Sequence, residues 1–338
     1  MCGIAGWYRR GGRPVDSAVL TEQCRRIVHR GPDDQGLLTD GDFGFGMRRL
    51  SIIDIAGGHQ PMETHDKRFA IVFNGEIYNH LDLRREIGAS YPFSTRSDTE
   101  TILAGFATWG DAVWARLEGM FAVALWDRLE RTLTLARDRS GMKPLYYSLQ
   151  DGGLAFASEV QALLNIPGVH FPVDPMAADQ FFRFGYTLPG RSIYAGVETL
   201  DPGHVLKLKA TGEAEIRPYW APRLAPAERR SEAEYVEELR SRWLDVVRSH
   251  LLADVEVGAF LSGGIDSSAV VAAMTLAIEG PVRTFTIGFP DKRYDESVHA
   301  ERVARHLGCE HTTHIVDIQK AMDVLPHVQR VLAIVRDF

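Results

Sequence analysis

Short apolar runs separated by turn residues fill the chain up to residue 216, a pattern typical of β-strands. The runs "CGIAGWY" and "FAIVFNGEIY" favour strands, and "FAVALWD" followed by "RTLTLARD" predicts a hairpin that turns across Arg128 to Arg131. Apolar residues recur at spacings of three and four in "SAVLTEQCRRIV" and "DTETILAGFATWG", which predicts two helices. We therefore expect an antiparallel sheet protein with packed helices in this part.

A stretch without periodicity follows, "RPYWAPRLAPAERRSEAE", and its content of Pro, Ala and charge predicts a linker over residues 217–232. Beyond it, strands and helices alternate, which predicts a parallel α/β sheet. The expected domains are residues 2–216 and 233–338. The elements expected in the second are a helix over 234–252, a strand over 255–261, a helix over 269–278, a strand over 282–289, a helix over 295–308 and a strand over 311–317.

Composition and charge narrow the class of protein. A chain of 338 residues has room for two domains, and its formal net charge of -7 provides no basic surface for nucleic acid. No stretch reaches the roughly 18 apolar residues of a membrane span, and no signal-peptide pattern opens the chain. We expect a cytoplasmic protein without a membrane partner, and a homodimer stays open. Cys2, Cys24 and Cys309 form neither a disulfide framework nor a zinc motif.

The second half carries a candidate anion site in "VEVGAFLSGGIDSSAVVAAM". Two glycines and three serines stand between the expected strand and helix, where free backbone N–H groups and the helix dipole attract anions. The loop lacks the Gly-Lys-Ser/Thr ending of a Walker A motif. A capped strand–helix turn is the plainer alternative.

In the first half, each candidate residue also has a plain structural explanation. Cys2 could serve as a nucleophile with its own α-amine as base once Met1 is removed. Asn74-Gly75 between apolar runs is a strong signal for a hairpin turn. Ser97 and Glu100 have the spacing of a capping box, with Asp98 as a first-turn acid. The structural explanations do not account for the occurrence of all these segments in one order.

Together, "MCGIAG", "HRGPDD", "RRLSIID", "QPM", "VFNGEIYNH" and "SDTE" resemble the glutaminase domain of class II glutamine amidotransferases. With "SGGIDSS" downstream, the chain is similar to the glutamine-hydrolysing asparagine synthetases. The resemblance implies an α+β N-terminal-nucleophile domain, an αββα sandwich, followed by a Rossmann-like α/β ATP-pyrophosphatase domain. It also implies that "HRGPDD" and "RDRSGMKPLYY" are mainly structural.

By this resemblance, Cys2 attacks the glutamine side-chain carbonyl, and the Asn74 amide with the Gly75 N–H stabilises the oxyanion. Arg49 would bind the substrate α-carboxylate and Asp98 its α-ammonium. Leu50, Ile52, Ile53 and Glu76 would complete the pocket.

The same resemblance assigns ATP binding to the second half. The loop would hold pyrophosphate, Asp266 would hold Mg²⁺, and Leu261 and Ile287 would line the adenosine pocket, although both are equally typical of a core. The residues implied are Leu261, Ser262, Gly263, Gly264, Asp266, Ser267, Ser268 and Ile287.

The expected reaction is glutamine hydrolysis in the first domain, internal passage of ammonia, and adenylation of a carboxylate with ATP and Mg²⁺ in the second, with aspartate as the default acceptor. Family members continue into a second acidic, Gly-rich motif and a Lys-bearing segment, and the tail departs from the family near Gln329. We therefore expect an incomplete α/β sheet with an apolar edge, and glutaminase activity with little asparagine formation. Two alternatives stay open: an amidotransferase for another carboxylate in a polysaccharide or peptide pathway, and a non-catalytic remnant or binding module.

Overall fold

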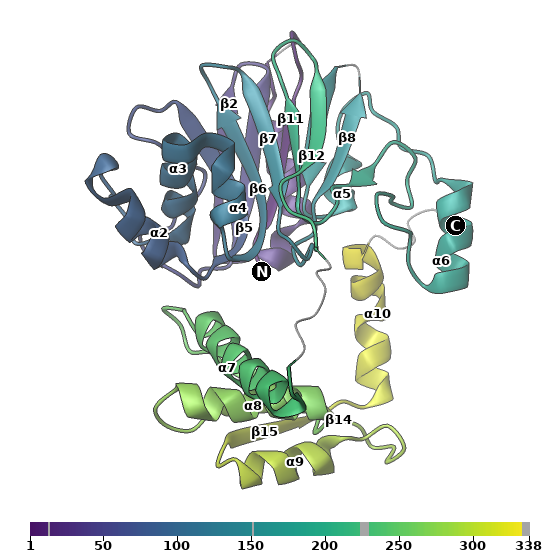
Figure 1. Cartoon of the computed structure of the whole chain (residues 1–338). Coiled ribbons are helices and arrows are strands. Elements are labelled where there is room, and N and C mark those ends of the chain that lie inside the picture. Colours follow the sequence, from purple (N-terminus) through teal and green to yellow (C-terminus); the bar gives the residue numbers. More distant parts are fainter. Residues whose placement is uncertain (13, 151, 224–229, 333–338) are drawn as a thin grey trace. The chain divides into compact units, whose positions relative to one another are not determined.

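The computed structural model describes residues 1–12, 14–150, 152–223 and 230–332. Its contacts divide the chain into two compact units, residues 1–223 and 224–338 (Figure 1). Part of the expected linker, residues 224–229, lies outside the described residues. Arg217 and Pro218, also expected in the linker, instead belong to the last strand of the first unit.

Two antiparallel sheets form the centre of the first unit. The first has the order β10-β8-β9-β1-β3-β2, and the second has the order β12-β11-β7-β6-β5-β4. The strands of the first are β1 (Gly3–Tyr8), β2 (Asp34–Asp40), β3 (Phe43–Arg49), β8 (Tyr146–Gln150), β9 (Gly153–Ala157) and β10 (Glu198–Thr199). Those of the second are β4 (Met62–Glu63), β5 (Phe69–Ile77), β6 (Gly119–Asp127), β7 (Thr132–Arg137), β11 (His204–Leu208) and β12 (Ala214–Pro218).

Helices cover the outer faces of both sheets (Figure 1). The helices of this unit are α1 (Ser17–Arg26), α2 (His80–Ile87), α3 (Asp98–Trp109), α4 (Val113–Arg116), α5 (Val160–Leu163) and α6 (Pro175–Phe184). One apolar cluster fills the space between the sheets, a second joins β5 and β6 to α3 and α4, and a third joins β1 and β9 to α5. This is the expected αββα sandwich.

The long apolar runs follow from these layers, because the central strands are covered on both faces. Every residue of β1 is buried. Gly6 lets the side chains of Phe156 and Phe45 pack against the backbone of β1, since a Cβ at this position would lie 2.5 Å from the Phe156 ring and 2.7 Å from the Cβ of Phe45. The predicted hairpin is confirmed: β6 and β7 are connected by the turn Arg128 to Arg131 and pair antiparallel.

The second unit is a small parallel α/β fold. Its sheet has the order β13-β14-β15 with all described pairs parallel. Its elements are α7 (Glu232–His250), β13 (Ala259–Phe260), α8 (Ile265–Ala277), β14 (Arg283–Gly288), α9 (Ser297–His306), β15 (Glu310–Ile315) and α10 (Ile318–Leu332). The alternation predicted from sequence is confirmed.

Two details of that unit differ from expectation. Only Ala259 and Phe260 of the run 255–261 form a strand. The apolar surface extends from an edge onto a face of the sheet: Phe260 on the edge strand β13 is exposed, Phe285 and Ile287 on β14 are exposed while Thr284 and Thr286 are buried, and the other edge strand, β15, is mostly polar. Period-two alternation places every second side chain of β14 on that face.

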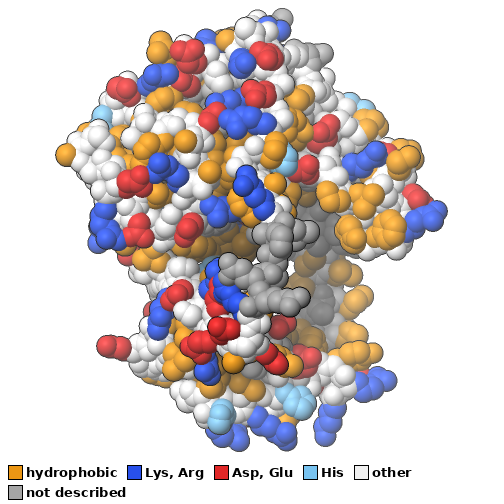
Figure 2. Space-filling model, viewed as in Figure 1, with side chains coloured by type: hydrophobic (Ala, Val, Ile, Leu, Met, Phe, Trp, Pro, Cys, Tyr) orange, Lys and Arg blue, Asp and Glu red, His pale blue; other side chains and the backbone are white. Residues whose placement is uncertain are grey.

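On the face seen in Figure 2, positive and negative side chains are interspersed over the first unit, and hydrophobic side chains gather near α6. Met176, Phe182, Phe184 and Tyr186 are exposed there. Within the described ranges, no helix combines the length and apolar character needed to cross a membrane.

Candidate active site

One pocket of the first unit gathers most of the residues expected to bind glutamine. It lies where the end of β3 and the loop after it meet β5 and the start of α3. Its free volume of about 20 Å³ holds about one water molecule and is too small for glutamine. The lining residues are Cys2, Arg49, Leu50, Ile52, Ile53, Gly58, Gln60, Phe73, Gly75, Glu76, Ser97, Asp98 and Thr99.

Cys2 stands at the start of β1, where its side chain packs against the cluster between the sheets. Its Sγ lies 3.4 Å from the Leu50 N, and the Arg30 Nε donates to the Cys2 carbonyl at 2.9 Å. Burial raises the pKa of the Cys2 thiol and lowers the pKa of the Met1 α-amine. The resting cysteine is therefore a thiol beside an amine that gives up its proton readily.

The Gly75 N–H points away from β6 and toward the pocket. In β5, the amide of Phe73 donates to the Gln60 Oε1 at 2.7 Å and that of Ile77 donates to the Asp98 Oδ2 at 3.0 Å. Alternate amides of a strand face the same side, so the Gly75 amide lies between these two bonds. Phe121 pairs with Gly75 across the ladder but does not hydrogen-bond to it: the Phe121 N–H donates to the Asp138 Oδ2, and the Phe121 carbonyl accepts from the Asp138 N–H.

Asn74 lies in the middle of β5, which corrects the hairpin turn suggested by Asn-Gly. Gly75 pairs with Phe121 in this ladder, and a Cβ on it would lie 2.1 Å from the Met120 carbonyl oxygen. The Asn74 side chain follows Val72 onto the face between the sheets, where Cys2 packs. Asn74 is 1% exposed, and its amide N and O are buried without a hydrogen-bond partner. It is not among the residues that line the small pocket.

Arg49 is buried at the end of β3 and holds the loop that follows. Its Nη1 donates to the Ile55 carbonyl at 3.0 Å, and its Nη2 donates to the carbonyls of Ile53 at 3.0 Å and Asp54 at 2.8 Å. A guanidinium has five N–H donors, so these bonds leave two. Arg49 reaches the pocket, but both terminal nitrogens of its fork are engaged by the loop.

Two acids share the other side of the pocket. Burial raises the pKa of Glu76, and the charge of Asp98 raises it further. Burial also raises the pKa of Asp98, although backbone N–H groups favour its ionised form. Lys143 is 6% exposed, and its positive charge opposes the shift at Glu76. Lys143 belongs to "RDRSGMKPLYY", which the resemblance treats as structural.

The raised pKa of Glu76 predicts how the free energy of unfolding depends on pH. Between the ordinary glutamate pKa and the raised pKa, the unfolded chain ionises Glu76 while the folded chain keeps the proton, so the free energy of unfolding falls as pH rises. We expect Glu76→Gln to remove this loss, giving a gain of about 1 to 3 kcal/mol at pH 8 relative to pH 4.5. Urea denaturation of both proteins at the two pH values measures it. As a control, the exposed Glu118→Gln variant should show the same pH dependence of unfolding free energy as the unchanged protein. If Glu76→Gln also showed that same dependence, the raised pKa of Glu76 would be contradicted.

The start of α3 differs in part from the expected capping box. The Ser97 Oγ accepts from the Thr99 N at 3.2 Å, as a cap should. Glu100, however, accepts from the amides of Ser94 at 2.8 Å and Thr95 at 2.7 Å, not from Ser97. The glutamate thus holds the turn before the helix, and Asp98 is left facing β5.

Gln60 was not predicted as a site residue, although its motif "QPM" contributes to the resemblance. Its Nε2 donates to the Thr99 Oγ1 at 3.0 Å, so it joins β5 to α3 behind the pocket. Burial of a glutamine between two polar partners has no signature in hydrophobic periodicity.

The "SGGIDSS" segment follows β13, as predicted, but its last four residues already belong to α8, which begins at Ile265 and not at Ala269. Gly263 has φ +80, and a Cβ there would lie 2.7 Å from the Ala300 N. Ser262 and Ser267 share a hydrogen bond of 3.0 Å between their hydroxyls, and the Ser268 Oγ donates to the Gly264 carbonyl at 2.6 Å. The loop therefore opens onto the N-terminus of a 13-residue helix, where unpaired amides attract anions.

The remaining residues that the resemblance assigns to ATP binding lie partly in the core and partly on the surface. Leu261 is 1% exposed and packs in the core of the unit, whereas Ile287 is exposed. Asp266 is an exposed acid in the first turn of α8. Among the described residues, no group of three or more His, Cys, Asp or Glu side chains is arranged around a metal site. One carboxylate beside a phosphate loop suits Mg²⁺, which binds through few carboxylates plus phosphate oxygens.

Comparison with known families agrees with this geometry. The family model for the glutamine amidotransferase domain matches residues 1–220. The chain belongs to the glutamine amidotransferase family. The asparagine synthase model matches residues 238–334, so the chain is an asparagine synthetase-like class II amidotransferase.

Three curated relatives of this amidotransferase are informative. Glutamine-hydrolysing asparagine synthetase 1 of Bacillus subtilis is 35% identical, over 97% of this chain and 52% of the relative. Glutamine-hydrolysing asparagine synthetase 3 of the same organism is 32% identical, over 99% and 57%. Amidase chyE of Penicillium rubens is 33% identical, over 92% and 50%. The chain spans about half the length of the curated relatives it matches.

Proposed function

We propose that this chain hydrolyses glutamine to glutamate and ammonia at Cys2. The observations that carry the proposal are the buried Asn74 amide without a partner, on the sheet face where Cys2 packs, and Gly75, which lines the same pocket as Cys2 with its N–H directed away from β6. Donors held in place before the reaction stabilise an oxyanion without reorganisation. The positive charge of an incoming α-ammonium group would favour the ionised forms of Glu76 and Asp98, which would then bind it.

Removal of Met1 would make the α-amine part of Cys2 and complete the catalytic pair. The amine takes the thiol proton, the sulfur bonds to the side-chain carbonyl carbon, and the proton then leaves with the departing ammonia. Water, activated by the same amine, hydrolyses the thioester and releases glutamate. Arg30 supports this geometry by holding the Cys2 carbonyl at 2.9 Å.

Entry of glutamine requires the loop after β3 to open, because the free volume is about 20 Å³. Arg49 provides a means, since a carboxylate is a stronger partner for a guanidinium than neutral carbonyls are. The α-carboxylate would replace carbonyls of Ile53, Asp54 or Ile55 on Arg49. Loop opening and substrate binding would then occur together.

For the whole protein, we infer ATP-dependent amidation of a carboxylate in the second unit. The backbone amides and serines of the "SGGIDSS" loop would hold pyrophosphate, and Asp266 would hold Mg²⁺. ATP would activate the acceptor as an adenylate. The relatives named asparagine synthetases favour aspartate as the acceptor.

The first experiment compares two forms of the chain. One carries a cleavable N-terminal tag, and the other is the same preparation after cleavage that leaves Cys2 as the first residue. We expect glutamate release from glutamine only after cleavage, because only then is the α-amine beside the thiol. Glutamate is measured by NMR.

Equal glutamate release by the tagged and cleaved forms would contradict the role of the α-amine. Absence of release from both forms, with folding confirmed by circular dichroism, would favour a binding module over an enzyme.

A further inference from the structure

A second cavity of the first unit has the features of a ligand site. Its volume is about 290 Å³, near the lower end for pockets that hold small molecules. It lies on the outer side of the first sheet, between the ends of β1, β8 and β9 and residues 166–171. The described residues that line it include none that line the pocket at Cys2.

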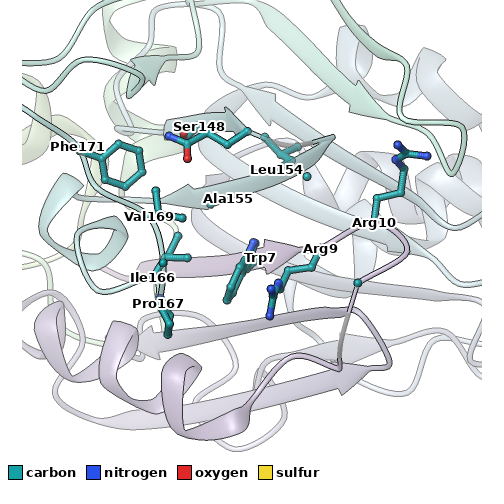
Figure 3. A pocket seen from close by; sticks show the side chains of 14 residues that line it. Trp7, Arg9, Arg10, Ser148, Leu154, Ala155, Ile166, Pro167, Val169 and Phe171 are labelled. Carbon is teal, nitrogen blue, oxygen red and sulfur yellow. The ribbon is translucent and has the colours of Figure 1, made fainter.

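One side of this cavity is apolar. Figure 3 shows Phe171, Val169, Ile166 and Pro167 along one side, with Trp7 facing them from β1. Trp7 is 9% exposed, and the Arg9 guanidinium lies 4.6 Å from its ring centroid. A planar group could pack against such a wall.

A buried hydroxyl in the cavity lacks a partner. Ser148 on β8 is 3% exposed, and its Oγ has no hydrogen bond. A buried polar group without a partner costs about 1 to 3 kcal/mol. Ser148 lines the cavity, and a rotation of its side chain would bring the shielded Oγ to a polar atom of a ligand.

The described charged residues that line the cavity are positive. Arg9 and Arg10 line it, and none of the described lining residues is acidic. The described ion pairs include neither arginine. Arg10 lies at the opposite end from Phe171 (Figure 3) and approaches the backbone of Gly212, where a Cβ would lie 2.7 Å from its Nε.

We propose that this cavity binds a small organic anion, a carboxylate or a phosphate ester on a planar apolar group. Arg9, whose guanidinium lies over Trp7, holds the anionic group, the apolar group packs between Trp7 and Phe171, and Ser148 hydrogen-bonds to a polar atom of the ligand. Charge-assisted bonds from arginine fix carboxylate and phosphate alike.

Isothermal titration calorimetry with the full chain tests the site with defined probes. Phenylacetate and phenyl phosphate distinguish the two anionic groups, benzyl alcohol is the neutral counterpart, and inorganic phosphate lacks the apolar group. We expect at least one aromatic anion to bind about tenfold or more tightly than both benzyl alcohol and inorganic phosphate. Equal affinity of the neutral probe, or binding of no probe, would overturn the proposal.

Variants then locate the binding. Arg9→Gln and Ser148→Ala should each weaken the aromatic anion about tenfold, the size of one hydrogen bond to a charged group. Arg183→Gln on the exposed face of α6 should leave affinity unchanged. Cys2→Ala should also bind normally, which separates this site from glutamine hydrolysis. Unchanged affinity in both cavity variants would contradict the site, and the probe comparison on the unchanged chain stands even if a variant does not fold.

Discussion

Replacing Cys2 with alanine is expected to reduce glutamate release from glutamine to the background rate, a fall of at least about 10⁴-fold. Alanine has no sulfur to form the thioester, and neither Asn74 nor Gly75 can replace a nucleophile. The side chain of Cys2 is only partly buried and makes weak contacts with Leu50. The variant should therefore fold normally, and an NMR assay of glutamate measures the loss.

Cys309→Ala is the matched control for this prediction. Cys309 is also a free cysteine of intermediate exposure, but it lies in the second unit. We expect its glutamate release to equal that of the unchanged chain. Activity retained in Cys2→Ala, or lost equally in both variants, would rule out Cys2 as the nucleophile.

Asn74→Ala is expected to lower kcat for glutamine hydrolysis by about 10²–10³-fold, the typical effect of losing one oxyanion donor. KM should change little, because the Asn74 amide acts on charge that develops only in the transition state. Stability should not fall, since both amide atoms are buried without partners and their removal ends a desolvation cost. Steady-state kinetics and urea denaturation test the two parts.

Asn79→Ala provides the opposite pattern for comparison. Its Nδ2 donates to the Arg116 carbonyl at 2.9 Å, and its Oδ1 accepts from the Glu118 N at 3.0 Å. Losing these bonds should cost about 1 to 2 kcal/mol of stability and leave kcat unchanged. A drop in stability without a drop in kcat for Asn74→Ala would show that Asn74 is structural.

The fold of the first unit was largely predictable from sequence because both faces of its central strands are covered. Continuous apolar runs such as that of β1 are the direct result, and the turn between β6 and β7 follows from polar residues between two such runs. Asn74-Gly75 shows the limit of local signals. Its neighbours on β5 pair with β6 over nine residues, and this tertiary pairing overrides the turn preference.

The second unit shows another limit. β14 and β15 were predictable as strands, but the face of the sheet that stays exposed was not. Phe285 and Ile287 face outward while Thr284 and Thr286 are buried, the reverse of what hydrophobicity alone favours. Helix placement decides which face of a strand is covered, and periodicity does not record it.

For the candidate site, the resemblance supplied the proposed roles of Cys2 and Asn74, whereas the residues that contact or surround the site residues became known only from the structure. Lys143 is far in sequence from Glu76, and its position depends on the turn that Asp138 holds through the Lys143 N–H at 3.1 Å. The bonds from Arg49 to the loop after β3 also arise from tertiary packing. These contacts determine the charge and closure of the pocket.

The most direct test of the account is to trap the proposed intermediate. The chain with Cys2 as its first residue is mixed with glutamine and quenched in acid, and the N-terminal peptide is weighed by mass spectrometry. We predict a peptide that carries one γ-glutamyl group on Cys2 during turnover and loses it when glutamine is exhausted. Glutamate release with no such peptide, and with equal activity in Cys2→Ala, would contradict the central claim.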